Sequence, residues 1–87
     1  MGADIHLLYF AWVRERIGHA EEYCAPPESV ESVGALIEWL RGRGPGYATA
    51  LAADGKVRAA VNQVFARVDT QVAPGDEVAF FPPVTGG

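Results

Sequence analysis

The sequence is poor in several residue types, and each shortage excludes a class of structure or partner. One cysteine cannot form a disulfide within the chain. The 7 lysine and arginine residues stand against 11 aspartate and glutamate residues, so the net charge is -4 and no basic cluster can neutralise nucleic-acid phosphates. No apolar run approaches the ~20 residues that span a bilayer. We therefore expect neither a nucleic-acid partner nor a membrane segment.

The first residues of the chain and its length predict where the protein is located and whether it can act as an enzyme alone. Residues 1–4 place no positive charge ahead of the first apolar stretch, which is unlike a secretion signal and, with the lone cysteine, predicts a cytoplasmic protein. With 87 residues, of which 49% are hydrophobic and 21% charged, the chain is expected to form one small globular domain. Such a domain leaves little room for a deep pocket, so we expect no catalysis by this chain on its own.

Two short strands are predicted in the first part of the chain. Residues 5–10 are apolar except for one histidine and include two aromatic side chains, which favours a strand. Residues 11–18 are charged and end in glycine, as in a loop or a helical turn. Residues 21–25 form the second predicted strand, which ends at Pro26 and Pro27 because proline cannot donate to a sheet.

A helix is predicted to begin after Ser32, whose hydroxyl can cap the first turn. Apolar residues then recur at the spacing of one helix face. They are Val33, Leu36, Ile37 and Leu40. Gly42 and Gly44, followed by Pro45, are expected to end the helix, and residues 46–53 are expected to be irregular.

Further strands are predicted at residues 57–61, 64–68 and 77–81. Asp54-Gly55 is a tight-turn pair ahead of the first of them, and residues 73–76 have the Pro-Gly centre of a type II turn ahead of the last.

This order of elements matches a mixed sheet with one main helix packed across one face. That is the α+β arrangement called the β-grasp, or ubiquitin-like, fold. We expect residues 1–81 to form the β-grasp domain and residues 82–87 to form an extended C-terminal tail.

Alternation along the predicted strands assigns each side chain to one face of the sheet. The side chains expected to face the helix are Ile5, Leu7, Tyr9, Val64, Ala66, Val68, Val78 and Phe80. The opposite face is expected to carry Phe10, Phe65 and Phe81 together with Leu8, and an exposed apolar patch of this kind marks a protein interface. Alternatively, a loop covers the patch, or a register shift of one residue exchanges the two faces.

The tail runs from Pro82 to Gly87. Two prolines bar a helix and favour an extended path, which at about 3.3 Å per residue reaches on the order of 20 Å from the domain. Gly86 and Gly87 have no side chain to obstruct a narrow channel, so the Gly87 carboxylate could enter another protein's active site. A carboxylate is a poor electrophile and would first need activation, for example as an acyl-adenylate. The alternative is a frayed chain end without function.

Three blocks of the sequence resemble the family of molybdopterin synthase small subunits, which are ubiquitin-like sulfur carriers. They are Leu8-Tyr9-Phe10-Ala11 with Arg14-Glu15 and Gly18, then Ala60-Val61-Asn62-Gln63, and the whole of Gly75 to Gly87. The third block is the most specific, because other Gly-Gly sulfur carriers generally lack the Phe-Phe-Pro-Pro-Val-Thr approach to the terminus. Tyr9 and Phe65 differ from residues frequent in the family, but both keep an apolar body.

The resemblance implies a cycle of sulfur transfer at Gly87. An ATP-using activating enzyme adenylates Gly87, and a sulfur donor converts the adenylate to a thiocarboxylate. The tail then enters the active site of the large synthase subunit, where sulfur passes to cyclic pyranopterin monophosphate during molybdenum cofactor biosynthesis. The tail residues that enter are Pro82, Pro83, Val84, Thr85 and Gly86. The family's synthase is a heterotetramer.

The resemblance also assigns the remaining surfaces and ligands. Phe10, Phe65 and Phe81 match the family's hydrophobic contact surface. The chain is then a non-catalytic subunit that binds no cofactor itself, since ATP binds to the activating partner.

Other functions share the Gly-Gly ending and stay open. The chain could carry sulfur for another thiolation pathway, or it could be a ubiquitin-like modifier joined through Gly87 to lysines of target proteins. A plain interaction module would use the aromatic face alone.

Several residues resemble functional groups but are interpreted as structural. Cys24 is expected to be a small buried hydrophobe, so that the carried sulfur sits on Gly87. His6 and His19 have no partner at metal-ligand spacing, and no metal is expected. Residues 21–22 are both glutamate and receive no assigned role.

Overall fold

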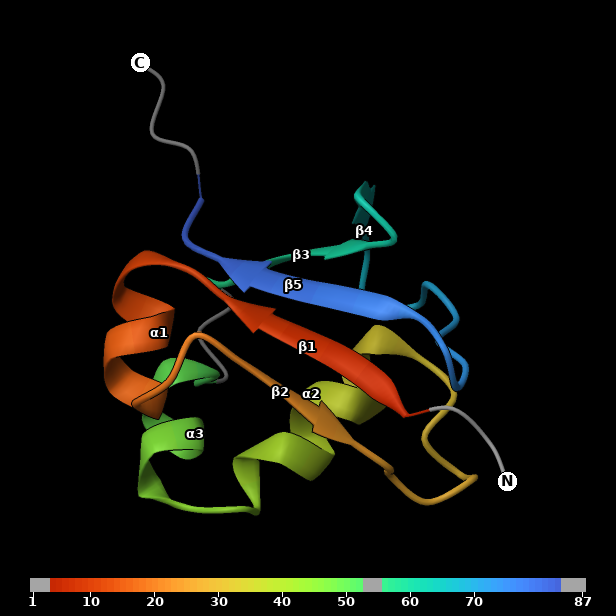
Figure 1. Ribbon diagram of the computed structural model, residues 1–87, viewed down its shortest axis with the longest axis horizontal. Coiled ribbons are helices and arrows are strands. Elements are labelled where there is room, and N and C mark those ends of the chain that lie inside the picture. The colour runs from red at the N-terminus through yellow and green to blue at the C-terminus, as the bar shows by residue number, and fades with distance from the viewer. Residues whose placement is uncertain (1–3, 53–55, 84–87) are drawn as a thin grey trace.

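One mixed sheet organises the fold (Figure 1). The structure is a computed structural model that describes residues 4–52 and 56–83. In their spatial order the strands are β2 (Glu21–Cys24), β1 (Ile5–Tyr9), β5 (Glu77–Phe81), β3 (Arg58–Val61) and β4 (Val64–Ala66). The central strands β1 and β5 are parallel, and the other neighbours are antiparallel.

Helices cover one face and one end of this sheet. Within the described residues they are α1 (Ala11–Ile17), α2 (Val33–Arg41) and α3 (Pro45–Ala50). Figure 1 shows α2 behind the sheet, while α1 and α3 gather at the end to which the arrows of β1 and β5 point. The predicted β-grasp fold, with one main helix across a mixed sheet, is confirmed.

The predicted helix is α2, and the structure contains both its predicted N-terminal cap and its predicted apolar stripe. The Ser32 hydroxyl accepts a hydrogen bond from the backbone N–H of Ala35 at 3.1 Å, which caps the first turn. Val33, Leu36 and Leu40 are buried against the sheet, so the apolar stripe forms one wall of the core.

The sequence prediction missed α3 and left α1 open. Residues 45–50 were expected to end one helix and begin an irregular stretch, but Pro45 instead opens α3, because proline suits the first position of a helix. Ala50 and Leu51 are buried, so α3 forms through packing rather than through a visible apolar stripe. The stretch at 11–18 is α1, which ends at Gly18 in the left-handed conformation with φ 102°.

The helices α1 and α3 approach so closely that Gly46 cannot hold a side chain. A Cβ at Gly46 would lie 2.6 Å from the carbonyl oxygen of Arg16 in α1. We therefore predict that Gly46→Ala lowers the free energy of unfolding by about 1–3 kcal/mol through overpacking, measured by urea denaturation. The control is Gly42→Ala, whose Cβ would meet nothing closer than the Trp39 carbonyl at 3.5 Å. Equal stability of the two variants would contradict the prediction.

The strands confirm most of the predicted ranges and turns. Residues 77–81 match β5, whereas the predicted ranges 5–10, 21–25, 57–61 and 64–68 are one or two residues too long. Gly75 takes φ 95°, and the N–H of Asp76 donates to the Ala73 carbonyl at 3.1 Å, as the predicted type II turn requires. The predicted turn at residues 54–55 lies outside the described residues.

The predicted orientation of side chains relative to the sheet is right for the central strands β1 and β5 and partly wrong for the edge strand β4. The predicted inward residues of β1 and β5 are all buried: Ile5, Leu7, Tyr9, Val78 and Phe80. Val64 and Val68 were also expected to face the helix, but they are 69% and 70% exposed. The strand β4 is short and lies at the edge of the sheet. Val68 belongs to the turn that follows β4, where its carbonyl accepts a hydrogen bond from the N–H of Gly34 in α2 while its side chain stays largely exposed.

Candidate functional site

The candidate site begins with an apolar row across the sheet face that points away from α2, which we call the outer face. Strand pairing places Leu8 beside Ala79, Ala79 beside Ala60, and Ala60 beside Phe65. The row therefore crosses β1, β5, β3 and β4 in register. Its two central members are alanines, so the larger side chains at either end stand above them.

The predicted aromatic residues lie on the outer face. Phe65 is 80% exposed and Phe10 is 49% exposed. Phe81 is half-buried, because the Phe65 ring lies against it with 5.9 Å between ring centroids. The small Ala60 side chain between their strands leaves room for this contact. The structure thus brings Phe65 and Phe81 together, and pairing of Tyr9 with Phe80 places Phe10 beside this pair.

Polarity on the outer face changes along the strands. At the end remote from residues 82–83, His6 stacks on Tyr23 at 4.4 Å between ring centroids and contacts Glu21 at 2.6 Å. The N–H of Glu77 donates to the Asn62 side-chain oxygen at 3.0 Å. Toward Phe81 the face becomes mostly apolar, with Arg58 of β3 as a charged residue paired opposite Phe81. A partner that covers the apolar end would also cover the point where the chain leaves the sheet.

The tail begins directly at that apolar end. Pro82 and Pro83 follow β5 without a break, lie outside any helix or strand, and are half-buried. In Figure 1 the chain leaves the sheet beyond the arrowhead of β5. The remaining predicted tail residues lie outside the described residues. They are Val84, Thr85, Gly86 and Gly87.

A second cluster, which the sequence did not indicate, surrounds Glu22 on the helix side of β2. Its carboxylate accepts hydrogen bonds from the Tyr9 hydroxyl at 2.8 Å and the Tyr47 hydroxyl at 2.5 Å. His19 lies 3.0 Å and Arg43 3.3 Å from the same carboxylate. The cluster ties β1 and β2 to α3 and to the segment before it. Glu22 shares its face of β2 with buried Cys24, which is the one sequence signal that could have located it.

The electrostatics of this cluster favour a charged Glu22. Burial opposes the charge, but hydrogen bonds from Tyr47, His19 and Tyr9, with the charge of Arg43, lower its pKa to about 2. Burial, and then the bond to Glu22, raise the pKa of Tyr9 and raise that of Tyr47 to about 12. Both hydroxyls therefore keep the protons that they donate. The hydroxyl of Tyr9 thus has a structural role.

We predict that Glu22 stabilises the fold in a pH-dependent way. Its pKa is about 2 in the folded state against 4.5 as the ordinary value, so its contribution is complete above about pH 4.5 and disappears as pH falls toward 2. Glu22→Gln should cost up to about 3 kcal/mol in the free energy of unfolding at pH 7.

Denaturant unfolding at pH 7 and at pH 3 measures this effect. The control is Glu38→Gln, which removes an exposed pair with Arg41 and should change stability by less than about 1 kcal/mol. The hypothesis fails if Glu22→Gln loses as much stability, relative to the unsubstituted chain, at pH 3 as at pH 7.

The described residues offer no metal site or reactive thiol. Cys24 is buried and unpaired, as predicted, and its burial raises the pKa of the thiol to about 11, which leaves it protonated and unreactive. Among residues 4–52 and 56–83, no group of three or more His, Cys, Asp or Glu side chains could hold a metal ion. No helix in this part of the chain is long and apolar enough to cross a membrane.

Comparison with known proteins agrees with these features. The molybdopterin synthase sulfur carrier subunit of Escherichia coli (strain K12) is 48% identical over 84 residues, which cover 95% of this chain and 99% of the relative. The name of this relative confirms the predicted resemblance to molybdopterin synthase small subunits.

Solved structures share the fold. A Pyrococcus furiosus protein assigned as molybdopterin converting factor subunit 1 has a TM-score of 0.77 and 30% identity, with 94% of this chain and 99% of that chain covered. Small archaeal modifier protein 1 of Haloferax volcanii has a TM-score of 0.77 and 26% identity, with 95% and 100% covered. A chain from the complex of subunits 1 and 2 of the molybdopterin-converting factor of Helicobacter pylori 26695 is 18% identical, with a TM-score of 0.64 and 97% and 99% covered, and shows the fold alone.

The family comparison reaches the tail as well as the domain. The model of the ThiS family matches residues 7–87, which include the apolar outer face, Pro82, Pro83 and the Gly-Gly ending. This chain therefore belongs to the ThiS family.

Proposed function

We propose that this protein is the sulfur carrier subunit of a molybdopterin synthase and that Gly87 bears the sulfur. The observation that supports this most directly is the match to the Escherichia coli sulfur carrier subunit over 99% of that relative's length. The apolar outer face at the base of the tail supports it independently, because a carrier must dock before its terminus can react.

Sulfur loading at Gly87 takes place in two steps, adenylation and thiocarboxylate formation. The Gly87 carboxylate attacks the α-phosphate of ATP on the activating enzyme, which forms an acyl-adenylate and releases pyrophosphate. Sulfide delivered by the sulfur donor then attacks the carbonyl carbon, the bond to AMP breaks, and a thiocarboxylate remains. The adenylate is needed because AMP is a far better leaving group than oxide.

Transfer to cyclic pyranopterin monophosphate follows in the large subunit. The thiocarboxylate sulfur attacks a side-chain carbon of the pterin, where a C–S bond forms as a C–O bond breaks and the oxygen substituent leaves with a proton. Water then cleaves the acyl–sulfur bond, which returns the Gly87 carboxylate and leaves sulfur on the product. Two such transfers supply the sulfur atoms of the dithiolene. The carrier itself provides the nucleophile and its position, while acid–base groups and ATP belong to its partners.

The outer face and the tail have separate roles: the outer face binds the partner, and the tail enters the partner's channel. Exposed Phe65 lies against half-buried Phe81, with Phe10 beside them, and aromatic side chains of this kind anchor protein interfaces. Docking of this surface would hold Pro82 and Pro83 at the entrance of the partner's channel. The partner would be the large subunit, in a heterotetramer with two carriers.

Reconstitution tests this function. The sulfur-loaded carrier is mixed with the large subunit and cyclic pyranopterin monophosphate, and the dithiolene product is measured. We expect product in proportion to the thiocarboxylate supplied. A carrier that loads sulfur but yields no product with an active large subunit would contradict the assignment and favour another thiolation pathway.

A ubiquitin-like modifier is the second candidate, since the fold and 26% of the residues match small archaeal modifier protein 1 of Haloferax volcanii. It predicts isopeptide-linked conjugates in extracts of the source cells that disappear when Gly87 is removed. Conjugates of this kind, without dithiolene production in reconstitution, would replace the carrier proposal with the modifier.

A further inference from the structure

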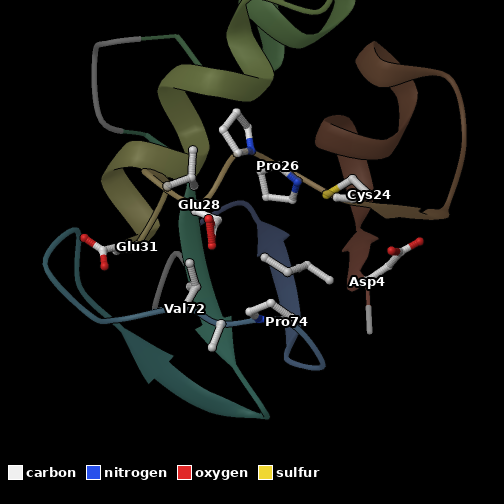
Figure 2. Close-up of a pocket in the computed structure, with 12 residues that line it drawn as sticks. Asp4, Cys24, Pro26, Glu28, Glu31, Val72 and Pro74 are labelled. Atoms are coloured by element: carbon white, nitrogen blue, oxygen red, sulfur yellow. The ribbon is translucent and has the colours of Figure 1, made fainter. Parts of the chain in front are cut away.

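A concave surface lies at the end of the domain remote from residues 82–83 (Figure 2). It is a cleft of about 490 Å³ between the start of β1, the segment that follows β2, and the loop that precedes β5. Because β1 and β5 are parallel, their starts lie together, and residues 82–83 leave from the opposite end of β5. A partner confined to the outer face and the tail would therefore leave this cleft accessible. Its volume is within the roughly 300–1,000 Å³ of typical ligand sites.

Most residues that line the cleft are apolar. They include Ile5, Pro26, Val30, Val72 and Pro74. Cys24 also lines the cleft, and since burial raises its pKa to about 11, the thiol adds no charge. Figure 2 shows Pro26 on one side of the opening and Val72 and Pro74 on the facing side. An alkyl chain would find van der Waals contact along these walls.

The charges around the cleft all have one sign. Its charged lining residues are Asp4, Glu28 and Glu31, and no basic residue lines it. Within the described part of the chain, none of these carboxylates has a side-chain hydrogen bond or an ion pair. Figure 2 shows Glu28 between Glu31 on one side and Asp4 on the other. The complement of this surface is an apolar stem with a cationic head.

We propose that this cleft binds an arginine side chain of a partner protein. The planar guanidinium offers donors to more than one carboxylate at once, and it is more weakly hydrated than a lysine ammonium. Its alkyl stem can pack against the prolines while the head stays near the carboxylates. The cleft is larger than one side chain and accommodates the residues that flank the arginine. Since tail and cleft lie at opposite ends, the same partner or a second one can occupy the cleft during sulfur transfer.

The test is a nuclear magnetic resonance titration of the whole ¹⁵N-labelled chain with N-acetylarginine amide. We expect saturable shifts of the Ala25, Val30 and Ala73 amides, and weaker binding by at least about tenfold in the triple variant Asp4→Asn, Glu28→Gln, Glu31→Gln. These side chains are exposed, so the fold should survive, and the amide spectrum reports this directly.

Two controls make the result decisive. N-acetylnorleucine amide has an apolar chain without the cation and should give no saturable shift. The variant Glu15→Gln, Glu38→Gln, Asp69→Asn removes equal charge from exposed sites outside the cleft and should bind arginine as the unsubstituted chain does. The proposal is overturned if no shift saturates, if norleucine matches arginine, or if the control variant loses as much affinity as the cleft variant.

Discussion

Removal of Gly87 is expected to abolish sulfur loading while the domain stays folded. The carboxylate that the activating enzyme must adenylate would move back by one residue, about 3.3 Å, out of reach of the reacting phosphate. Loading is measured as thiocarboxylate formed with ATP, the activating enzyme and a sulfur donor, and it should fall to the level seen without ATP.

The fold and the docking surface serve as internal controls for this truncation. Circular dichroism and the unfolding temperature should match those of the full chain, and the affinity of the outer face for the large subunit should change much less than loading does. Gly87→Ala keeps the length and tests whether a methyl group fits the channel. Undiminished sulfur transfer by the truncated chain would refute the assignment of Gly87.

Phe65→Asp is expected to weaken binding of the large subunit by about a hundredfold or more. A buried aromatic anchor at an interface commonly contributes 2 kcal/mol or more, which corresponds to about thirtyfold, and a buried unpaired carboxylate adds its desolvation cost. Since Phe65 is 80% exposed, the substitution should leave the stability of the free domain nearly unchanged. Calorimetric titration of the purified large subunit measures the affinity.

Val64→Asp is the matched control for this prediction. Val64 precedes Phe65 in β4, is 69% exposed, and points to the other face of the sheet. The Val64→Asp variant should therefore bind the large subunit almost as well as the unsubstituted chain. Equal losses in the two variants would show that general charge on β4, and not the aromatic pair, governs binding.

The central part of the fold could be predicted because its signals are local. Ser32 and the spacing of Val33, Leu36 and Leu40 specify α2 within a single segment. Alternation in β1 and β5 places buried and outward side chains correctly, since both strands are central and their inner face packs against residues of all three helices. The outer aromatic surface follows from the same alternation.

The parts that escaped prediction depend on contacts between distant segments. The helix α3 has only six residues and forms where Gly46 lets it approach α1, which no local pattern reveals. Alternation failed at Val68 because β4 ends two residues earlier. Glu22 is one of two adjacent glutamates that received no role from the sequence, yet it binds Tyr9, Tyr47 and Arg43 from separate parts of the chain.

The central claim, that Gly87 carries sulfur, is tested most directly by the intact mass of the protein. The chain is isolated from its source cells under mild, thiol-free conditions, and part of it is treated with the activating enzyme, ATP and a sulfur donor. We predict a species heavier by one exchange of oxygen for sulfur, with the added mass located in the C-terminal peptide that contains Gly87. If only the carboxylate form is present after that treatment, the chain is not a sulfur carrier.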